Sequence, residues 1–498
     1  MPRFEAFEGR QRELTLMDRL WHSRDAAFLI LYGRRRVGKT RLLKHWSQQP
    51  TEELGGKRVL YWVATPASAS DQLRSFSQAV YNFANPQIIA PVDFSYATWS
   101  QAWQQVANLA KVERFALFVD EFDWVLAITP SIAGILQNAW DHILSQSNLF
   151  LVLSGSNLSM MQRYLLSYQA PLYGRASRQL HLQPIPFGNT RAFFPNFRAD
   201  ERTAIYAIFG GIPAYWERVE LGQSILDNIR EQLLTPDTLM QAEPRLLLQD
   251  FVNEPHNYVS LLGAIANGAR LQKEISQRTG LAQGHVSKYL SVLREAGFIE
   301  RRVPITANAN SRLGRYYITD PYLRFYYRFL FSQQAQLAME ESEPVLAEIR
   351  HHLIDFVGSH TWQELCREWT LRAGVKGVLP FMPDQVGSAW AKTSQIDVVG
   401  INTMERTLLL GVCDWEVDLA DCSLLRLLEA RTAAIIPKQG RWRVFYLGFA
   451  RVGWTAAAKA FAAETSMRNV QVGNWQVEGM KLLDLQRIDD DLAYWIAP

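Results

Sequence analysis

The sequence predicts an α/β protein of several domains that begins with a parallel β-sheet. Three apolar runs in its first part, FLILYG, FALFVD and NLFLVLSG, each stop at a glycine or an acidic residue. Continuous apolar runs are typical of strands buried on both faces, as in parallel sheets. A helical pattern follows the first run, with apolar residues at Leu42, Leu43 and Trp46. The 498 residues suffice for about three domains.

The composition is that of a globular protein, with 48% hydrophobic and 20% charged residues. No run approaches the roughly 18 apolar residues of a membrane helix, and the polar start MPRFEAFEGRQREL lacks the apolar core of a signal peptide. The three cysteines, Cys366, Cys413 and Cys422, form no CxxC pair, which argues against a disulfide framework or a zinc knuckle. We therefore expect a cytoplasmic protein that does not enter a membrane.

A phosphate-binding motif follows the first apolar run. The segment GRRRVGKT matches GxxxxGK[ST] between a predicted strand and a predicted helix. The backbone N–H groups of such a loop surround phosphate, and the helix N-terminus adds partial positive charge. We expect Lys39 to reach the β- and γ-phosphate oxygens and Thr40 to bind Mg²⁺. The predicted ATP-binding residues are Gly33, Arg34, Arg35, Arg36, Val37, Gly38, Lys39, Thr40 and Arg41.

The second apolar run ends in two adjacent acids, Asp120 and Glu121. The carboxyl ends of parallel strands open at the ligand crevice, so both side chains are expected beside the phosphate loop. Asp120 would then hold the Mg²⁺ ion, and Glu121 would orient or polarise the attacking water. The alternative is a strand that simply ends in two solvated acids.

Polar residues after the third run and a downstream arginine are further candidates. Ser156 or Asn157 would sense the γ-phosphate or position water, although turn-forming residues commonly follow strands. Arg175, in the segment PLYGR, would act as an arginine finger, in cis or from a neighbouring subunit. The alternative for a lone arginine is an ordinary surface salt bridge.

Six segments in order, FEGRQREL, GRRRVGKT, VDEFDW, LSGSN, PLYGR and IFGGIPAYW, resemble the prokaryotic archaeal-ATPase family. These are AAA-related P-loop ATPases of the signal-transduction (STAND) type. The resemblance implies an ATPase core at 1–188 and a helical lid at 189–255, and it makes Arg10 and Pro213, with Gly211, candidate nucleotide-binding residues. Without it, the Gly-Gly-x-Pro element would be interpreted as a helix end followed by a turn.

Residues 256–335 predict a winged helix-turn-helix. A short helix around Ile275 precedes a turn at Thr279-Gly280-Leu281, and the segment HVSKYLSVLREAG forms a second helix with one apolar face. Two short strands with a polar loop between them would make the wing. Residues 269–320 carry nine Lys or Arg and four Asp or Glu, a net +5 that exceeds the +3 of the whole chain.

This local charge favours contact with duplex DNA. On the second helix, the candidates for contact with bases are Gln283, His285, Ser287, Lys288 and Ser291. Around the wing, the candidates for contact with phosphates are Arg301, Arg302, Arg312 and Arg315. The alternative is a winged helix that packs against protein instead of DNA.

Residues 336–498 resemble the PD-(D/E)XK nuclease fold, which many members of the family carry at this position. Glu364 on a helix and Asp397 on a strand fit that fold. The expected E-C-K-W reads V-C-D-W here, so Val412 replaces a metal-binding carboxylate and Asp414 replaces the lysine that stabilises hydroxide. We expect an inactive domain kept for binding DNA or protein. The alternative is a migrated site made of Asp397, Asp414 and Glu416.

The complete prediction is an α/β protein with a P-loop NTPase core, a helical lid, a winged helix-turn-helix and a C-terminal α/β nuclease-like domain. It would bind and hydrolyse ATP with Mg²⁺ and couple its nucleotide state to DNA or a protein partner, as a monomer or an oligomer. The alternatives are a nucleotide-gated DNA-binding regulator with little turnover, and a Mg²⁺-dependent nuclease.

Overall fold

The computed structural model describes residues 7–23, 25–50, 56–249, 255–308, 310–391, 394–468 and 471–496. The chain forms two compact units. Unit 1 comprises Met1–Ile185 with the short segment Ile212–Glu217, and unit 2 comprises Pro186–Gly211 with Arg218–Pro498. The four predicted domains, with borders at 188, 255 and 335, stay a prediction.

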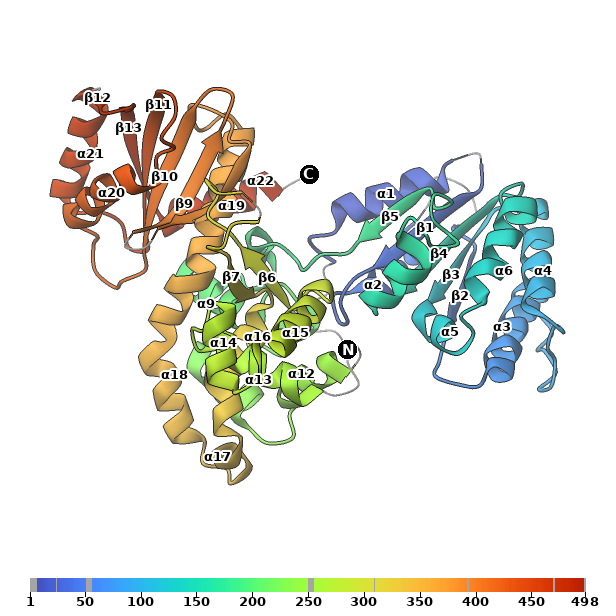
Figure 1. Cartoon of the computed structure of the whole chain (residues 1–498). Coiled ribbons are helices and arrows are strands. Elements are labelled where there is room, and N and C mark those ends of the chain that lie inside the picture. The colour runs from blue at the N-terminus through green and yellow to red at the C-terminus, as the bar shows by residue number, and fades with distance from the viewer. Residues whose placement is uncertain are drawn as a thin grey trace. The chain divides into compact units, whose positions relative to one another are not determined.

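A five-stranded parallel sheet in the order β2-β3-β4-β1-β5 forms the centre of unit 1 (Figure 1). The three apolar runs become its three central strands and are almost wholly buried, as continuous apolar runs require. The predicted α/β class is confirmed. The strands are β1 (Ala27–Tyr32), β2 (Val59–Val63), β3 (Phe115–Asp120), β4 (Leu149–Gly155) and β5 (Arg178–His181).

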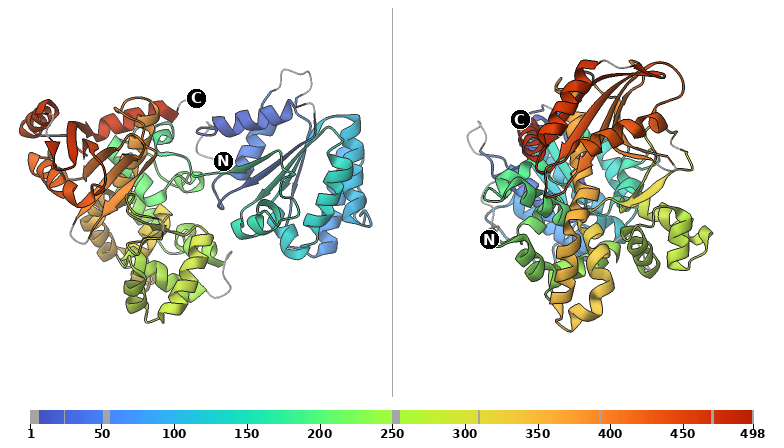
Figure 2. Two further views of the ribbon diagram at one scale, coloured as in Figure 1. Left: turned by 45° about the horizontal axis from the view of Figure 1, so that its top comes forward. Right: turned by 90° about the vertical axis from the view of Figure 1, so that its left-hand side faces the viewer.

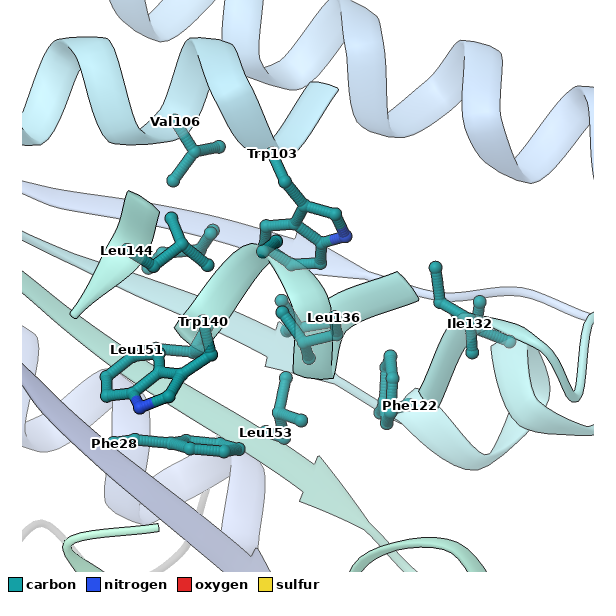
Figure 3. Close-up of a cluster of buried hydrophobic side chains, with 14 of the residues drawn as sticks. Phe28, Trp103, Val106, Phe122, Ile132, Leu136, Trp140, Leu144, Leu151 and Leu153 are labelled. Atoms are coloured by element: carbon teal, nitrogen blue, oxygen red, sulfur yellow. The ribbon is translucent and has the colours of Figure 1, made fainter. Parts of the chain in front are cut away.

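Helices cover both faces of this sheet. On one face the α2 side chain Trp46 packs against Phe118 and Phe150, with ring centroids 5.7 and 5.6 Å away. The other face carries a larger apolar core, in which side chains of α4 and α6 lie over those of the strands (Figure 3). The helices are α1 (Gln11–Trp21), α2 (Lys39–Gln48), α3 (Ala69–Ala84), α4 (Trp99–Val112), α5 (Phe122–Ile128), α6 (Ile132–Ala139), α7 (Leu158–Met161) and α10 (Pro213–Trp216).

Unit 2 begins with short helices and continues into a helix-turn-helix with a two-stranded wing (Figure 2). The turn between α14 and α15 is made by Gly280 at φ 70°, and Gly297 at φ 78° ends α15, so both glycines meet a left-handed backbone. The elements are α8 (Thr190–Phe193), α9 (Ala199–Phe209), α11 (Ile225–Ile229), α12 (Leu239–Gln249), α13 (Pro255–Ala266), α14 (Gln272–Thr279), α15 (Gln283–Glu295), β6 (Ile299–Arg302), β7 (Arg315–Ile318), α16 (Pro321–Phe325), α17 (Gln334–Ala338) and α18 (Ser342–Phe356).

The last part of unit 2 is a six-stranded mixed sheet in the order β12-β13-β11-β10-β9-β8. The pairs β10–β11 and β11–β13 are parallel and the others are antiparallel. Its elements are α19 (Gln363–Val375), β8 (Gln385–Trp390), β9 (Gln395–Asn402), β10 (Thr407–Asp414), α20 (Cys422–Ile435), β11 (Trp442–Ala450), α21 (Ala456–Arg468), β12 (Gln471–Val472), β13 (Trp475–Asp484) and α22 (Leu485–Ile496).

Ion pairs fasten the first helices of unit 2 to its last helix. The carboxylate of Asp489 on α22 is fully buried and accepts from Arg191 on α8 and Arg202 on α9. Arg451, which follows β11, donates to Asp200 on α9 at 2.8 Å. A buried carboxylate must be paired to be tolerated, so these contacts specify how α22 packs on the predicted lid. No helix in the described ranges is both long and apolar enough to cross a membrane.

Candidate functional site

The phosphate loop connects β1 to the N-terminus of α2, as its sequence predicts. Gly33 is required by close packing, because a Cβ atom there would lie 2.6 Å from the carbonyl oxygen of Leu182. Gly38 has φ 101°, a left-handed conformation that glycine adopts without steric cost, and it directly precedes α2. The loop therefore ends with the N–H groups of a helix N-terminus, the arrangement that binds phosphate.

Lys39, the first residue of α2, is buried inside the loop and is only 5% exposed. Its Nζ donates to the carbonyl oxygens of Gly33 at 2.9 Å and Arg34 at 3.2 Å. Burial lowers the pKa of Lys39, and the negative charge of Glu121 opposes that shift. The ammonium group thus lies beside the predicted acidic residues.

Thr40 and Asp120 meet directly, as the predicted metal pair requires. The Thr40 hydroxyl donates to Oδ2 of Asp120 at 2.7 Å, and Asp120 is 1% exposed. The same oxygen accepts from the Tyr61 hydroxyl on β2 at 2.5 Å. Burial, followed by the charge of Asp120, raises the pKa of Tyr61, so this phenol stays a hydrogen-bond donor. Hydroxyl and carboxylate oxygens are ligands that suit Mg²⁺, and the pair fits such an ion.

Glu121 turns the chain from β3 into α5 in a left-handed conformation, with φ 53°. Its Oε2 accepts from the Ser156 hydroxyl at 2.9 Å, so two predicted residues on neighbouring strands are in contact. Burial raises the pKa of Glu121, and the charge of Asp123 raises it further. Asn157, the other sensor candidate, accepts from the Met160 N–H through its side chain and caps α7.

Asp123 and Tyr61 are polar groups of this site that the motifs do not identify. Asp123 is 8% exposed, and its Oδ2 accepts the backbone N–H of Asn157 at 2.9 Å and that of Ser156 at 3.4 Å. An acid two positions after Glu121 in VDEFDW was the available signal for Asp123. Tyr61 lies on a strand without a motif, and no sequence signal pointed to it.

The segment 212–217 contacts the phosphate loop from outside. Arg34 donates to the Tyr215 hydroxyl at 2.6 Å, and Arg41 pairs with Glu217 at 2.6 Å. Pro213 begins α10 and lies near Gly38, at 3.9 Å from the place of a Cβ atom. Beside these contacts lies an open cavity of about 760 Å³, lined by Phe7, Arg35, Arg36, Gly38, Lys39, Thr40, Arg41, Lys44, His45, Gln48, Glu121, Trp124, Pro213, Ala214 and Glu217.

Three predicted arginines of unit 1, Arg10, Arg34 and Arg175, do not line this cavity. Arg10 is buried behind the loop and donates to the carbonyl oxygen of Val37 at 2.9 Å, so it supports the loop from outside. Arg175 makes a bidentate pair with Asp141 at 2.9 Å and also donates to the carbonyl oxygen of Pro171. A role as arginine finger stays a prediction and would require this pair to open.

The second helix of the helix-turn-helix exposes four of the five residues predicted to contact bases, Gln283 among them, whereas Ser291 is half-buried and donates to Glu295. His285, Ser287 and Lys288 of α15 are all exposed, whereas Val286, Leu290 and Leu293 form its buried face. On the wing loop Arg312 is also exposed. Arg301 instead turns toward the loop and donates to the carbonyl oxygen of Ser311.

The rest of the wing packs against the C-terminal sheet. Arg302 donates to Glu364 of α19 at 2.9 Å, and Arg315 donates to Gln395 at 3.1 Å and stacks over Trp390. The backbone N–H of Ile305 donates to the carbonyl oxygen of Ser388 at 3.0 Å. Three of the four arginines predicted to bind phosphate therefore make contacts within the protein: Arg302 and Arg315 with the C-terminal part of unit 2, and Arg301 with its own loop.

The residues of the alternative nuclease site do not assemble. Glu364, the helix glutamate that fits the nuclease fold, is not part of that alternative site and is paired with Arg302 and Arg324. β10 ends at Asp414, so the predicted strand alternation does not extend to Glu416, which is exposed beyond the strand. Among the described residues, no group of three His, Cys, Asp or Glu side chains could hold a metal ion.

Comparison with known proteins identifies the parts of the chain. Residues 7–219 match a family described as an ATPase domain predominantly from Archaea. Residues 257–303 match the IclR helix-turn-helix domain, and residues 326–425 match a family of archaeal and bacterial proteins of unknown function. The resemblance drawn from the motifs is thereby confirmed: the chain carries an archaeal-type ATPase domain, followed by a helix-turn-helix domain.

Two relatives come from Methanocaldococcus jannaschii. An uncharacterized protein is 29% identical over 415 residues, which cover 83% of this chain and 88% of that protein. An uncharacterized ATP-binding protein is 53% identical over 38 residues, 8% of this chain and 64% of that protein.

Two solved structures are also similar. A Walker-type ATPase of Pyrococcus abyssi has 17% identity and a TM-score of 0.48, and the match covers 65% of this chain and 96% of that one. The ORC2 protein of Aeropyrum pernix has 13% identity and a TM-score of 0.42, and the match covers 68% and 96%.

Proposed function

We propose that this protein is a Mg²⁺-dependent ATPase that couples its nucleotide state to binding of duplex DNA. The observation that carries the proposal is that Lys39, Thr40 and Glu121 line one cavity, where Asp120 accepts from the Thr40 hydroxyl, although these residues come from two segments distant in the sequence. Positioning and electrostatic stabilisation of the transferred phosphoryl group are the main tasks of such a site.

The residues of the loop divide these tasks. The N–H groups at the start of α2 and the ammonium group of Lys39 bind the β- and γ-phosphates, and Lys39 exchanges its two carbonyl acceptors for phosphate oxygens. Thr40 and Asp120 would hold Mg²⁺, which supplies charge neutralisation between the phosphates. The stacked rings of Phe7 and His45 also line the cavity and offer a flat surface for the base.

Glu121 is the proposed base that orients the attacking water. Its raised pKa strengthens it as a proton acceptor, and the Ser156 hydroxyl fixes one of its two oxygens at 2.9 Å. The other oxygen remains for water. In this proposal Ser156 orients the Glu121 carboxylate. It can do so because it directly follows β4, the strand next to β3.

The DNA contacts are proposed to come from α15 and from Arg312. His285, Ser287 and Lys288 are exposed on one helix, the geometry by which a recognition helix enters a major groove. Arg302 and Arg315 are engaged with the C-terminal sheet and are not part of the proposed DNA surface. A protein partner would then be left to the outer surface of the C-terminal sheet.

Steady-state ATP hydrolysis by the full chain, with and without duplex DNA, tests this proposal. We expect turnover that DNA stimulates and that both Lys39→Ala and Glu121→Gln abolish. Lys39→Ala should remove nucleotide binding, whereas Glu121→Gln should retain it. Turnover that DNA does not change would contradict the coupling of ATP hydrolysis to DNA binding and would point to a protein partner. Nucleotide binding without any turnover would contradict the ATPase and leave a nucleotide-gated binding protein.

A further inference from the structure

Asp123 is a buried carboxylate that the proposed hydrolysis does not yet use. It stands in the first turn of α5, three residues after the proposed metal ligand Asp120. Its Oδ2 accepts two consecutive backbone N–H groups, from Asn157 at 2.9 Å and from Ser156 at 3.4 Å. The hydroxyl of Ser156 lies 3.4 Å from the same oxygen. All these contacts are made to the segment that follows β4.

The distances around the Ser156 hydroxyl indicate which of the two carboxylates accepts its proton. The Ser156 hydroxyl has one proton and two carboxylates within reach, Glu121 at 2.9 Å and Asp123 at 3.4 Å. The shorter contact takes the proton, so Ser156 donates to Glu121. Asp123 is left to hold the backbone on which Ser156 stands. Both backbone N–H groups reach the single oxygen Oδ2, which can accept them together because a carboxylate oxygen carries two lone pairs.

We propose that Asp123 is a positioning residue for ATP hydrolysis: it fixes the backbone of Ser156 and Asn157 and thereby keeps the Ser156 hydroxyl aimed at Glu121. The inference rests on the proposed ATPase function and extends it to a residue of the VDEFDW segment to which the sequence analysis assigned no role. It assigns Asp123 no contact with nucleotide. The bond from the Asn157 N–H, at 2.9 Å, has the length of a charge-assisted hydrogen bond, whereas the contact from the Ser156 N–H, at 3.4 Å, is weaker.

The test compares kcat and KM for ATP in the full chain carrying Asp123→Ala, Asp123→Asn or Asp93→Ala. We expect Asp123→Ala to lower kcat about 10- to 100-fold, because a misplacement of about 1 Å at a catalytic group costs up to about 100-fold. KM and nucleotide affinity should stay within about twofold of the wild type. Asp123→Asn keeps one acceptor oxygen and should restore kcat to within about threefold. Asp93 is exposed in the loop before α4 and serves as the control.

A second comparison separates positioning through Ser156 from any independent role. Ser156→Ala should lower kcat by itself, and the double variant with Asp123→Ala should be no slower than Ser156→Ala alone. A kcat loss in the double variant that equals the product of the two single losses would overturn the inference. An unchanged kcat in Asp123→Ala would also overturn it, as would a kcat that Asp123→Asn does not restore. A wild type that binds ATP without turnover would overturn the ATPase and the inference together. A wild type that turns over beside an unaffected Asp123→Ala would overturn the inference alone.

Discussion

Glu364 joins the helix-turn-helix to the C-terminal sheet, and its removal should destabilise unit 2. Its Oε1 accepts from Arg302 of the wing at 2.9 Å and from Arg324 of α16 at 3.0 Å. Arg324 is only 4% exposed. The change Glu364→Gln keeps the shape of the side chain and removes its charge. Arg302 and Arg324 then lose their shared carboxylate, and the guanidinium group of Arg324 stays buried without that negative partner.

The magnitude follows from the pKa of this carboxyl. Burial alone would raise the pKa of Glu364, but the charges of Arg324 and Arg302 outweigh it and lower the pKa to about 2, from an ordinary 4.5. A shift of one unit is worth about 1.4 kcal/mol, which gives about 3 kcal/mol of stability at neutral pH. The Glu364 side chain remains 29% exposed, so solvent screens part of this, and we expect a loss of about 2–3 kcal/mol.

The pH dependence has a definite sign. A carboxyl whose pKa is lowered on folding stabilises the folded state above its unfolded pKa, and that stability is lost as the pH falls through the folded value. The wild type should therefore lose the contribution of Glu364 between about pH 4.5 and pH 2. Glu364→Gln has no such group to titrate. The difference in the free energy of unfolding between the wild type and this variant should therefore become smaller over this pH interval.

The assay is urea unfolding followed by circular dichroism and tryptophan fluorescence, at pH 7 and at decreasing pH. Glu368→Gln is the matched control, because Glu368 lies on the same helix and pairs with Arg372 as a partly exposed i,i+4 pair. We expect the control to lose less than about 0.5 kcal/mol. Equal losses in the two variants, or a gap that stays constant down to pH 2, would refute the reasoning.

Three further outcomes are expected. Arg10→Ala should weaken nucleotide binding about 10-fold in equilibrium titration, since the loop loses a buried support, while the exposed Arg12→Ala should not. Tyr61→Phe should lower kcat for ATP hydrolysis about 10-fold at unchanged nucleotide affinity, because Asp120 loses the phenol donor to Oδ2. Lys288→Ala should lower DNA affinity and reduce the slope of log K against log salt by about 0.9 for one lost phosphate contact, or leave the slope unchanged if it contacts a base.

Contiguous motifs made much of unit 1 predictable. The strands around the phosphate loop and Asp120 follow from apolar runs and from the geometry of parallel sheets, because their information lies within a few adjacent residues. Tyr61 was not predictable, since its hydroxyl reaches Asp120 only after β2 and β3 pair in a given register. That register is a property of the whole sheet, which no local pattern in the sequence expresses.

The partners of the wing arginines could not be predicted from the sequence for a different reason. Its arginines were assigned to DNA from their charge, and charge alone does not distinguish a phosphate from a carboxylate as partner. Arg302 finds Glu364, which stands 62 positions away in the sequence. Arg315 lies over Trp390 of an edge strand in the C-terminal sheet. Because the acceptor belongs to a distant element, only the folded unit reveals that the wing is used inside the protein.

The same pairing gives Glu364 a structural role that needs no metal ion. Val412 stands where a carboxylate would be needed, and Glu364 is neutralised by Arg302 and Arg324 instead. The carboxylate thus fastens the C-terminal sheet to the helix-turn-helix, while Asp489 fastens α22 to the predicted lid. In the proposed switch, the segment Ile212–Glu217 belongs to unit 1 although the chain on both sides of it belongs to unit 2. If ATP binding displaces that segment, the displacement reaches unit 2 through the chain at both of its ends, which is what the proposed coupling requires.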